Sequence, residues 1–483
     1  MSLRRKTISG LIWTFSQQFS LQFIGFCISI VLARILSPAE FGLIAMISLF
    51  ISLGNSLMDS GMTSSLIRTK DADQNDYSTV FFVNLLSSFF LYALLYIAAP
   101  FIAAFYKQNV LIDIIRVYSL TFIVQALVGV QYARLTKEMN FKTQMFIQIP
   151  SLIGGGILGI ILAYHNHGVW SLVWMSLFQS FLVAVQLWLF SGWKPNFLFD
   201  KGKFRQHFSF GYRMTLSGIL HTLYSNIYLL IIGKYYSAAQ LGFYTRAVSI
   251  RDLPISNLSS ALNKVTYPMF SAISDDDRKL AKAYKTIMIQ LVFWLTPILI
   301  FGAIVAKPFF TILLTEKWLP AVPYFQILCV AGIIYPLANY NLNILKVKGR
   351  SDLHFRLEII KKSYSVIGLL FAVQFGIYGL LYFQLISYLL EFYVNSFYSG
   401  KLIDYSFKEQ LNDIMPTLLL ATIIGFLTWL LNSYLVATFQ MNNFMLILIV
   451  GVFYASFYLI TSRVFRLVAI DDFRQMVFKK GIG

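Results

Sequence analysis

The sequence predicts an all-α integral membrane protein with about fourteen transmembrane helices. The chain has 483 residues, is 58% hydrophobic and has a mean hydropathy of +0.68. Long stretches contain no charged residue, and a helix needs about 20 apolar residues to cross the hydrocarbon core of a bilayer. Lys and Arg concentrate in alternate loops, the bias that orients membrane helices.

The uncharged stretches place the helices. Two of them are about twice the length of one span, and each breaks at polar residues, His165–Gly168 and Gln440–Asn443. The long uncharged stretches are 7–33, 77–106, 143–193, 214–233, 286–306, 318–345, 363–390 and 414–462. Four less apolar spans complete the set, near 41–62, 111–133, 240–262 and 378–399.

The basic residues predict the orientation. If the chain starts in the cytoplasm and crosses fourteen times, 30 of its 39 Lys and Arg residues fall in inner segments. A miscounted helix would exchange the sides of every later loop and destroy this bias. Both termini are therefore predicted to be cytoplasmic. The predicted inner loops include 63–76, 134–142, 194–208, 264–285 and 346–362.

Composition argues against several function classes. A net charge of +18 would suggest nucleic acid in a soluble chain, but here the basic residues are spread over short loops that face anionic lipid. The sequence has no P-loop motif and no Ser/His/Asp or Cys/His set. His165 and His167 lack further ligands nearby, and Asp71 and Asp73 lie in a short loop. We predict no enzyme activity, cofactor, metal site or nucleic-acid partner.

An internal repeat divides the chain. Residues 32–43 align without gaps on 232–243, at an offset of 200 residues. The identical pairs are Ser37/Ser237, Ala39/Ala239 and Gly42/Gly242. Both copies end the first helix of a six-helix set, so the sets are parallel repeats about an axis along the membrane normal. We predict two lobes, 1–203 and 204–400, around a central cavity, and a peripheral helix pair with a cytoplasmic tail in 401–483.

A polar stripe marks the seventh predicted helix. Its members are Arg213, Ser217, His221, Tyr224 and Tyr228. Their spacings of three and four place them on one helix face. Such a stripe forms either a helix–helix seam or a wall of the cavity, and its arginine favours the cavity.

The eighth predicted helix, near 240–262, carries a second polar stripe that contains Asp252. Arg246 and Arg251 lie beside it, and Pro254 is expected to kink the helix. The arginines either pair with Asp252 to stabilise the fold or bind a ligand. Because two arginines face one aspartate, at least one cation remains available for a ligand.

A further set of charged residues suggests a gate and ion coupling. Arg34 and Lys234 end equivalent helices of the two repeats, so we expect contacts with Glu40 or with carbonyl groups at helix ends. Carboxylates within spans either carry ions or remain neutral structural groups. The candidates for ion coupling are Asp59, Asp252 and Glu391.

The segment Ala33-Arg-Ile-Leu-Ser-Pro-Ala-Glu-Phe-Gly42 resembles the end of helix 1 in Wzx-type polysaccharide exporters. These exporters belong to the multidrug/oligosaccharidyl-lipid/polysaccharide (MOP) superfamily. Residues 58–68 resemble the end of the family's second helix, and Gly242–Arg246 matches a further run. The resemblance covers nearly the whole chain and is closest to the subgroup with colanic-acid and teichuronic-acid exporters.

The resemblance implies a flippase of the bacterial inner membrane. Its cargo would be an undecaprenyl-pyrophosphate-linked oligosaccharide, moved by alternating access for surface polysaccharide synthesis. Arg213, Arg246 and Arg251 would bind the diphosphate. Other polysaccharide-assembly membrane proteins are candidate partners. The alternatives are a MATE-like drug exporter, which needs a carboxylate-rich cavity, and a glycan polymerase or ligase, which needs a large outer loop.

Overall fold

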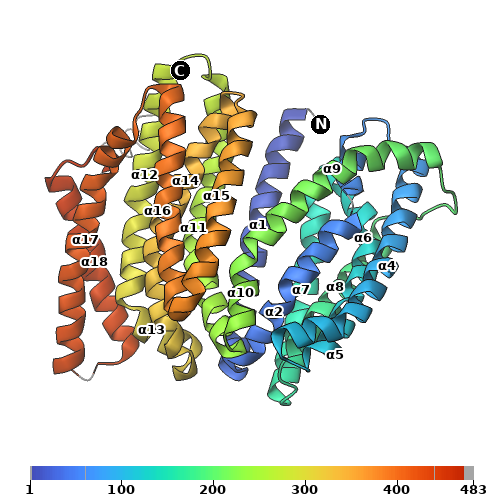
Figure 1. The fold of residues 1–483 in the computed structure, drawn as a ribbon, viewed down its shortest axis with the longest axis horizontal. Helices are drawn as coiled ribbons and strands as arrows, with labels where there is room; N and C mark the ends of the chain where they lie inside the picture. Colours follow the sequence, from blue (N-terminus) through green and yellow to red (C-terminus); the bar gives the residue numbers. More distant parts are fainter. Residues whose placement is uncertain (1–2, 60, 440, 471, 473–483) are drawn as a thin grey trace. The chain divides into compact units, whose positions relative to one another are not determined.

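The structure of the chain is a computed structural model that describes residues 3–59, 61–439, 441–470 and 472. Side chains are described except at 3–12, 59, 213, 260–261, 263–265 and 267. The described residues form α-helices and short 3₁₀ turns without a β-strand, which confirms the all-α fold class (Figure 1). The helices are α1 (Leu3–Ile35), α2 (Pro38–Asp59), α3 (Met62–Arg68), α4 (Gln74–Tyr106), α5 (Leu111–Tyr118), α6 (Leu120–Lys137), α7 (Phe141–Tyr164), α8 (Trp170–Phe190), α9 (Lys201–Ser225), α10 (Ile227–Tyr235), α11 (Ala238–Ala272), α12 (Asp277–Ile304), α13 (Ala306–Leu314), α14 (Val322–Val347), α15 (Ser351–Ala372), α16 (Gly376–Ile403), α17 (Phe407–Thr438) and α18 (Asn443–Val464).

The helices have the length and composition of a multi-pass membrane protein. Among the described residues, 11 helical segments are long and apolar enough to span a membrane, and 12 if the bent pair α9–α10 forms one span. One of these segments, Ser351–Ile403, contains both α15 and α16. The polar helix α11 is not among them. The helix order is compatible with fourteen crossings, a number that stays a prediction.

The chain divides into two compact units, Met1–Gly242 and Phe243–Gly483. We call them the first and the second unit and describe each by itself. Helices α9 and α10 belong to the first unit, where α9 contacts α2, α3 and α4. The predicted lobe boundary, between residues 203 and 204, lies about forty residues earlier, in the first turn of α9. The division into two six-helix lobes stays a prediction.

In the first unit, three predicted inner loops meet at one end. The Lys137 ammonium donates to the Thr69 carbonyl oxygen at 2.7 Å. The Gln74 amide donates to the Lys194 carbonyl oxygen, also at 2.7 Å. These bonds join the loops 63–76, 134–142 and 194–208. The charge pattern therefore groups these loops correctly, because an odd error in helix number would have separated them.

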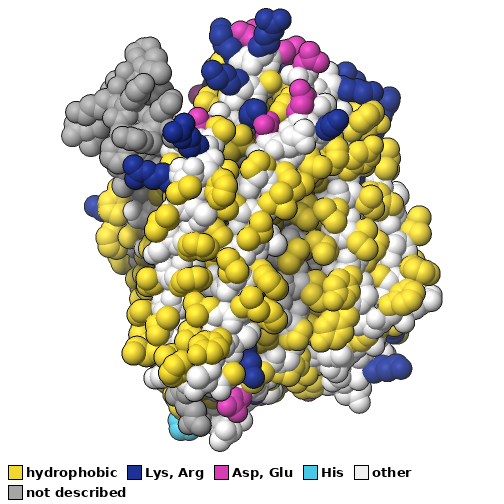
Figure 2. Space-filling view, turned by 90° about the vertical axis from the view of Figure 1, so that its left-hand side faces the viewer, with side chains coloured by type: hydrophobic (Ala, Val, Ile, Leu, Met, Phe, Trp, Pro, Cys, Tyr) yellow, Lys and Arg dark blue, Asp and Glu magenta, His cyan; other side chains and the backbone are white. Residues whose placement is uncertain are grey.

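The second unit shows the same grouping. Lys348, which follows α14, pairs with Asp277 at the start of α12. Lys285 in α12 pairs with Asp413 in α17, with 2.8 Å between Nζ and Oδ1. The segments around 277, 348 and 407 therefore share one end, which we call the basic end. On the face drawn in Figure 2, charged side chains gather at one end above a broad hydrophobic surface.

Small residues let helices approach closely, as they do in other membrane proteins. In α7, Gly155 and Gly159 face α8. A Cβ on Gly155 would lie 2.9 Å from the Met175 carbonyl oxygen, and a Cβ on Gly159 would lie 2.9 Å from the Met175 Cβ. Any larger side chain would push α7 and α8 apart.

Candidate functional site

The two copies of the internal repeat meet within the first unit. A Cβ on Gly42 would lie 1.8 Å from the Ala238 carbonyl oxygen. A Cβ on Gly242 would lie 1.9 Å from the Pro38 carbonyl oxygen. The first turns of α2 and α11 therefore cross backbone against backbone, in a nearly symmetric contact that only glycine permits. We call this contact the glycine crossing.

Matching capping boxes fix the two helix starts at the crossing. The Ser37 amide and hydroxyl groups donate to Glu40 Oε2 at 2.6 and 2.8 Å. The Ser237 amide and hydroxyl groups donate to Gln240 Oε1 at 3.1 and 3.3 Å. Such boxes satisfy amide groups that have no partner within the helix. Glu40 and Gln240 thus occupy equivalent structural positions.

The candidate gate residues lie around this crossing. The Lys234 ammonium donates to the Phe105 carbonyl oxygen at 2.7 Å and lies 4.2 Å from the centre of the Phe105 ring. Lys234 therefore binds a carbonyl at a helix end, one of the two partners expected for it. Glu40 Oε1 lies against Gly168, where a Cβ would come within 2.5 Å of it. Arg34 is exposed, and the gate role of these residues stays a prediction.

The polar stripe of the seventh predicted helix is interrupted. The helix breaks at Asn226, and α9 and α10 meet at an angle of 45°. The Asn226 side-chain amide donates to the Thr222 carbonyl oxygen at 2.8 Å. Asparagine competes in this way with helical backbone bonds.

The break leaves the first part of the stripe on α9 and moves Tyr228 to α10. The expectation of one continuous helical face is therefore wrong. Ser217 and His221 are exposed and Tyr224 is half-buried. The side chain of Arg213 lies outside the described residues.

The second unit buries both arginines of α11. Arg246 is 6% exposed, and its guanidinium carbon lies 5.3 Å from the centre of the Trp318 ring, which is cation–π geometry. Arg251 is 5% exposed and donates from Nε to Asp252 Oδ1 at 2.8 Å. The pairing that the sequence left open therefore exists for Arg251. Its Nη1 is buried and has no hydrogen-bond partner among the described residues.

Hydroxyl and aromatic groups line the neighbouring helices α14 and α16. The Tyr244 hydroxyl donates to Gln384 Oε1 at 3.4 Å, and the Gln384 amide donates to the Tyr388 hydroxyl at 3.0 Å. The rings of Tyr335 and Tyr388 lie 5.0 Å apart. Arg251 packs on α14 at Gly332, where a Cβ would lie 3.0 Å from the Arg251 Cδ.

The second unit also contains an apolar groove on α14. It has a volume of about 440 Å³ and is lined by α12, α14 and α17. Its wall runs from the buried Cys329 to the exposed Trp429. Cys329 lies three residues before Gly332 on α14, so the two residues share a helix face. The groove and Arg251 therefore both border α14, although Arg251 does not line the groove.

The candidate ion-coupling carboxylates differ in their surroundings. The Asp59 side chain lies outside the described residues, and Asp252 is paired with Arg251. Glu391 is half-buried in α16. Among the described residues, no group of three or more His, Cys, Asp or Glu side chains could hold a metal ion. The coupling role of these carboxylates stays a prediction.

A buried charge cluster that the sequence reasoning missed ties α9 to α3 and α4. Asp76 is fully buried and accepts from the Lys203 ammonium at 2.9 Å. Its other oxygen lies 3.0 Å from His207 Nε2, and His207 Nδ1 lies 2.8 Å from the Ser65 hydroxyl. Ser65 is only 6% exposed, so this Ser–His–Asp chain holds helices together. The spacing of four residues places Lys203 and His207 on one face of α9, but it does not identify Asp76 as their partner.

A close backbone contact supports the same attachment. Gly61 has a φ of +66°, which favours glycine. A Cβ there would lie 2.6 Å from the Gly211 carbonyl oxygen of α9. Arg68 stacks 4.5 Å above the Phe210 ring. The inner part of α9 is thus fixed to the first unit.

Polar and charged residues within an all-helical membrane fold often mark the path of a transported substrate. Solved structures share this fold. The lipid II flippase MurJ in an inward closed conformation matches with a TM-score of 0.72 at 15% identity, over 94% of this chain and 98% of MurJ. The MATE multidrug transporter DinF-BH matches with a TM-score of 0.52 at 14% identity, over 83% of this chain and 97% of that chain. The chain therefore shares its fold with these two transporters.

The family is defined by sequence. The profile of the polysaccharide biosynthesis protein family matches residues 31–323, more than half of the chain. The chain belongs to this family, which confirms the resemblance seen at Ala33–Gly42. The teichuronic acid biosynthesis protein TuaB of Bacillus subtilis is 28% identical over 73% of this chain and 74% of its own length. The lipopolysaccharide biosynthesis protein WzxC of Escherichia coli is 26% identical over 82% of both chains.

Proposed function

We propose that this protein is a flippase that moves an undecaprenyl-pyrophosphate-linked oligosaccharide across the bacterial inner membrane for surface polysaccharide synthesis. The observation that carries the proposal is the buried Arg251 of the second unit, whose Nη1 has no hydrogen-bond partner among the described residues. The known roles in the names of its relatives, among them the succinoglycan biosynthesis transport protein ExoT of Rhizobium meliloti, support the same cargo class.

The site matches the three chemical parts of such a cargo. A diphosphate requires charged hydrogen-bond donors, and Arg251 Nη1 is a buried donor that bonds to no described residue. A polyprenyl chain requires an apolar track, which the groove supplies. Sugars require hydroxyl groups and aromatic faces, which Tyr335 of α14 and Tyr388 of α16 supply.

The balance of charge argues against a drug exporter of the same fold. A cavity for cationic drugs needs net negative charge, whereas this part of the second unit buries two arginines, Arg246 and Arg251, and Asp252 pairs with Arg251. Burial strengthens the repulsion of a cation because the local dielectric is low. A cargo that carries phosphate is negatively charged, so the same arginines attract it.

Alternating access would use the glycine crossing as its outer closure, with the termini and the basic loops in the cytoplasm. The cargo would enter from the inner leaflet, where the assembly of the oligosaccharide leaves it. Other polysaccharide-assembly membrane proteins are partners in this proposal. Arg213, if it faces the same path, would add a third cation.

The experiment is complementation in a bacterium that lacks its own exporter of the same glycan. The wild-type chain should restore surface polysaccharide and clear the lipid-linked precursor that otherwise accumulates. Arg251→Ala should fail, and cationic-dye resistance should stay unchanged throughout. A chain that confers dye resistance but leaves the precursor in place would identify a drug exporter and refute the proposal.

A further inference from the structure

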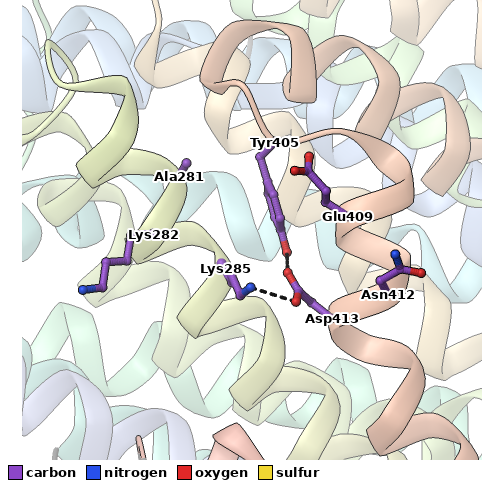
Figure 3. Close-up of a pocket in the computed structure, with 7 residues that line it drawn as sticks. All are labelled: Ala281, Lys282, Lys285, Tyr405, Glu409, Asn412 and Asp413. Atoms are coloured by element: carbon purple, nitrogen blue, oxygen red, sulfur yellow. Dashed lines mark hydrogen bonds and ion pairs between the residues drawn. The ribbon is translucent and has the colours of Figure 1, made fainter.

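A pocket at the basic end of the second unit is separate from Arg251 and the apolar groove. It has a volume of about 530 Å³, within the range of about 300–1,000 Å³ that is usual for small-ligand sites. It lies between the second and third turns of α12 and the first two turns of α17, as Figure 3 shows. Its lining residues are Ala281, Lys282, Lys285, Tyr405, Glu409, Asn412 and Asp413.

The pocket has a positive and a negative side. Lys282 and Lys285 come from α12, whereas Glu409 and Asp413 come from α17 (Figure 3). Its formal charge is therefore balanced, but the two signs lie on opposite walls. A simple anion would gain on one wall and lose on the other, so the complementary ligand carries both charges.

The negative side is held in place by its own hydrogen bonds. Asp413 accepts from Lys285 at 2.8 Å and from the Tyr405 hydroxyl at 2.6 Å. Burial and the bond to Asp413 raise the pKa of Tyr405, so this hydroxyl remains a donor. Glu409 accepts from the Ser406 amide and hydroxyl groups through Oε2, both at 2.7 Å.

Donors and acceptors remain for a ligand. Lys285 gives one of its three N–H groups to Asp413. Lys282 and Asn412 are exposed at the mouth of the pocket. The capping bonds of Glu409 use Oε2, so its Oε1 is available as an acceptor for a cation.

An apolar track leads away from the mouth along α17. Asn412 is followed on the same helix face by exposed apolar residues, at spacings of four, three, four and three. These residues are Pro416, Leu419, Ile423 and Phe426, and the last of them, Phe426, is also where the track reaches the apolar groove. Both α12 and α17 are long and apolar enough to span a membrane. The pocket therefore lies where the headgroup of a bilayer lipid meets its acyl chains.

We propose that this pocket binds a phosphoethanolamine headgroup, with its phosphate on Lys282 and Lys285 and its ammonium on Glu409 and Asn412. The source is a zwitterionic phospholipid, whose acyl chains would follow the α17 track. The lipid would join the α17–α18 pair to α12. This inference goes beyond the flippase function and does not depend on it.

Native mass spectrometry of the purified full-length chain tests the proposal. Phosphatidylethanolamine should bind at least about fivefold more tightly than phosphatidylglycerol or phosphatidylcholine with the same acyl chains, the ratio for one charged contact. Phosphatidylglycerol lacks the cation, and the quaternary ammonium of phosphatidylcholine has no N–H group to donate. Equal binding of the three lipids would overturn the proposal.

Variants locate the site. Lys282→Ala and Asn412→Ala should each weaken phosphatidylethanolamine binding about fivefold, and Lys282→Arg should keep it. Lys408→Ala is the matched control, since Lys408 is an exposed lysine of α17 that does not line the pocket. Unchanged binding in the Lys282→Ala, Asn412→Ala double variant, with a normal melting temperature, would refute the site. If soluble phosphoethanolamine competes as strongly as the lipid does, the pocket recognises the headgroup as proposed, but its ligand is a soluble compound and not a membrane lipid.

Discussion

Replacing Gly42 with alanine is expected to force the glycine crossing open. The new Cβ would lie 1.8 Å from the Ala238 carbonyl oxygen, whereas real Cβ contacts are almost never shorter than 3.0 Å. The two backbones must therefore separate by at least 1.2 Å, the difference between these distances. Overpacking of this kind costs about 1–3 kcal/mol, a factor of about 5–150 in the population of the closed crossing.

The assay is glycan export in a strain without its own exporter, with protein amount and melting temperature measured in parallel. Gly242→Ala should cause a loss similar to that of Gly42→Ala, because its Cβ would lie 1.9 Å from the Pro38 carbonyl oxygen. The double variant should lose less than the sum, since either alanine opens the same contact. Gly218→Ala in α9 is the control, because no atom lies within 4 Å of its Cβ. Normal export by both crossing variants would refute the role of this contact.

Three further predictions concern the cargo site, the charge cluster and the topology. Arg251→Lys should retain more export than Arg251→Ala, since lysine keeps the charge but loses the forked donors. An equal loss of export in the two variants would exclude a diphosphate site that depends on the charge of Arg251. His207→Ala should lower stability by about 3–5 kcal/mol, seen as a lower melting temperature in detergent, and an unchanged temperature would contradict the buried network. In a chain without native cysteines, an impermeant thiol reagent should label a cysteine at Asn166 in intact cells and spare cysteines at Lys70 and Asp275. The reverse pattern would invert the topology.

Much of the fold was predictable because each membrane helix corresponds to one continuous apolar stretch of the sequence. Uncharged stretches marked most helices, and the alternation of basic loops grouped their ends correctly. The break at Asn226 was not predictable, because the surrounding stretch from 214 to 233 is uniformly free of charge. Only the folded chain shows that the Asn226 side chain takes the Thr222 carbonyl.

The candidate site was predictable in part. The repeat pointed to Gly42 and Gly242 as equivalent, but only their distances to Ala238 and Pro38 show why both are glycine. The polar stripe on the eighth predicted helix pointed to Arg251 as a candidate site residue and to Asp252 as its partner in an ion pair. The Asp76 cluster joins segments more than 120 residues apart, and a single sequence contains no information on such pairs.

The central claim is tested most directly by measuring transport with purified components. The chain would be reconstituted into vesicles that contain an undecaprenyl-pyrophosphate-linked oligosaccharide with a fluorescent label, and a membrane-impermeant quencher would report the leaflet. We predict that the wild-type protein moves the labelled lipid between leaflets and that Arg251→Ala does so at least about tenfold more slowly, the factor for the loss of ~1.4 kcal/mol. A wild-type rate equal to that of protein-free vesicles, under an imposed ion gradient or membrane potential of either sign, would contradict the account.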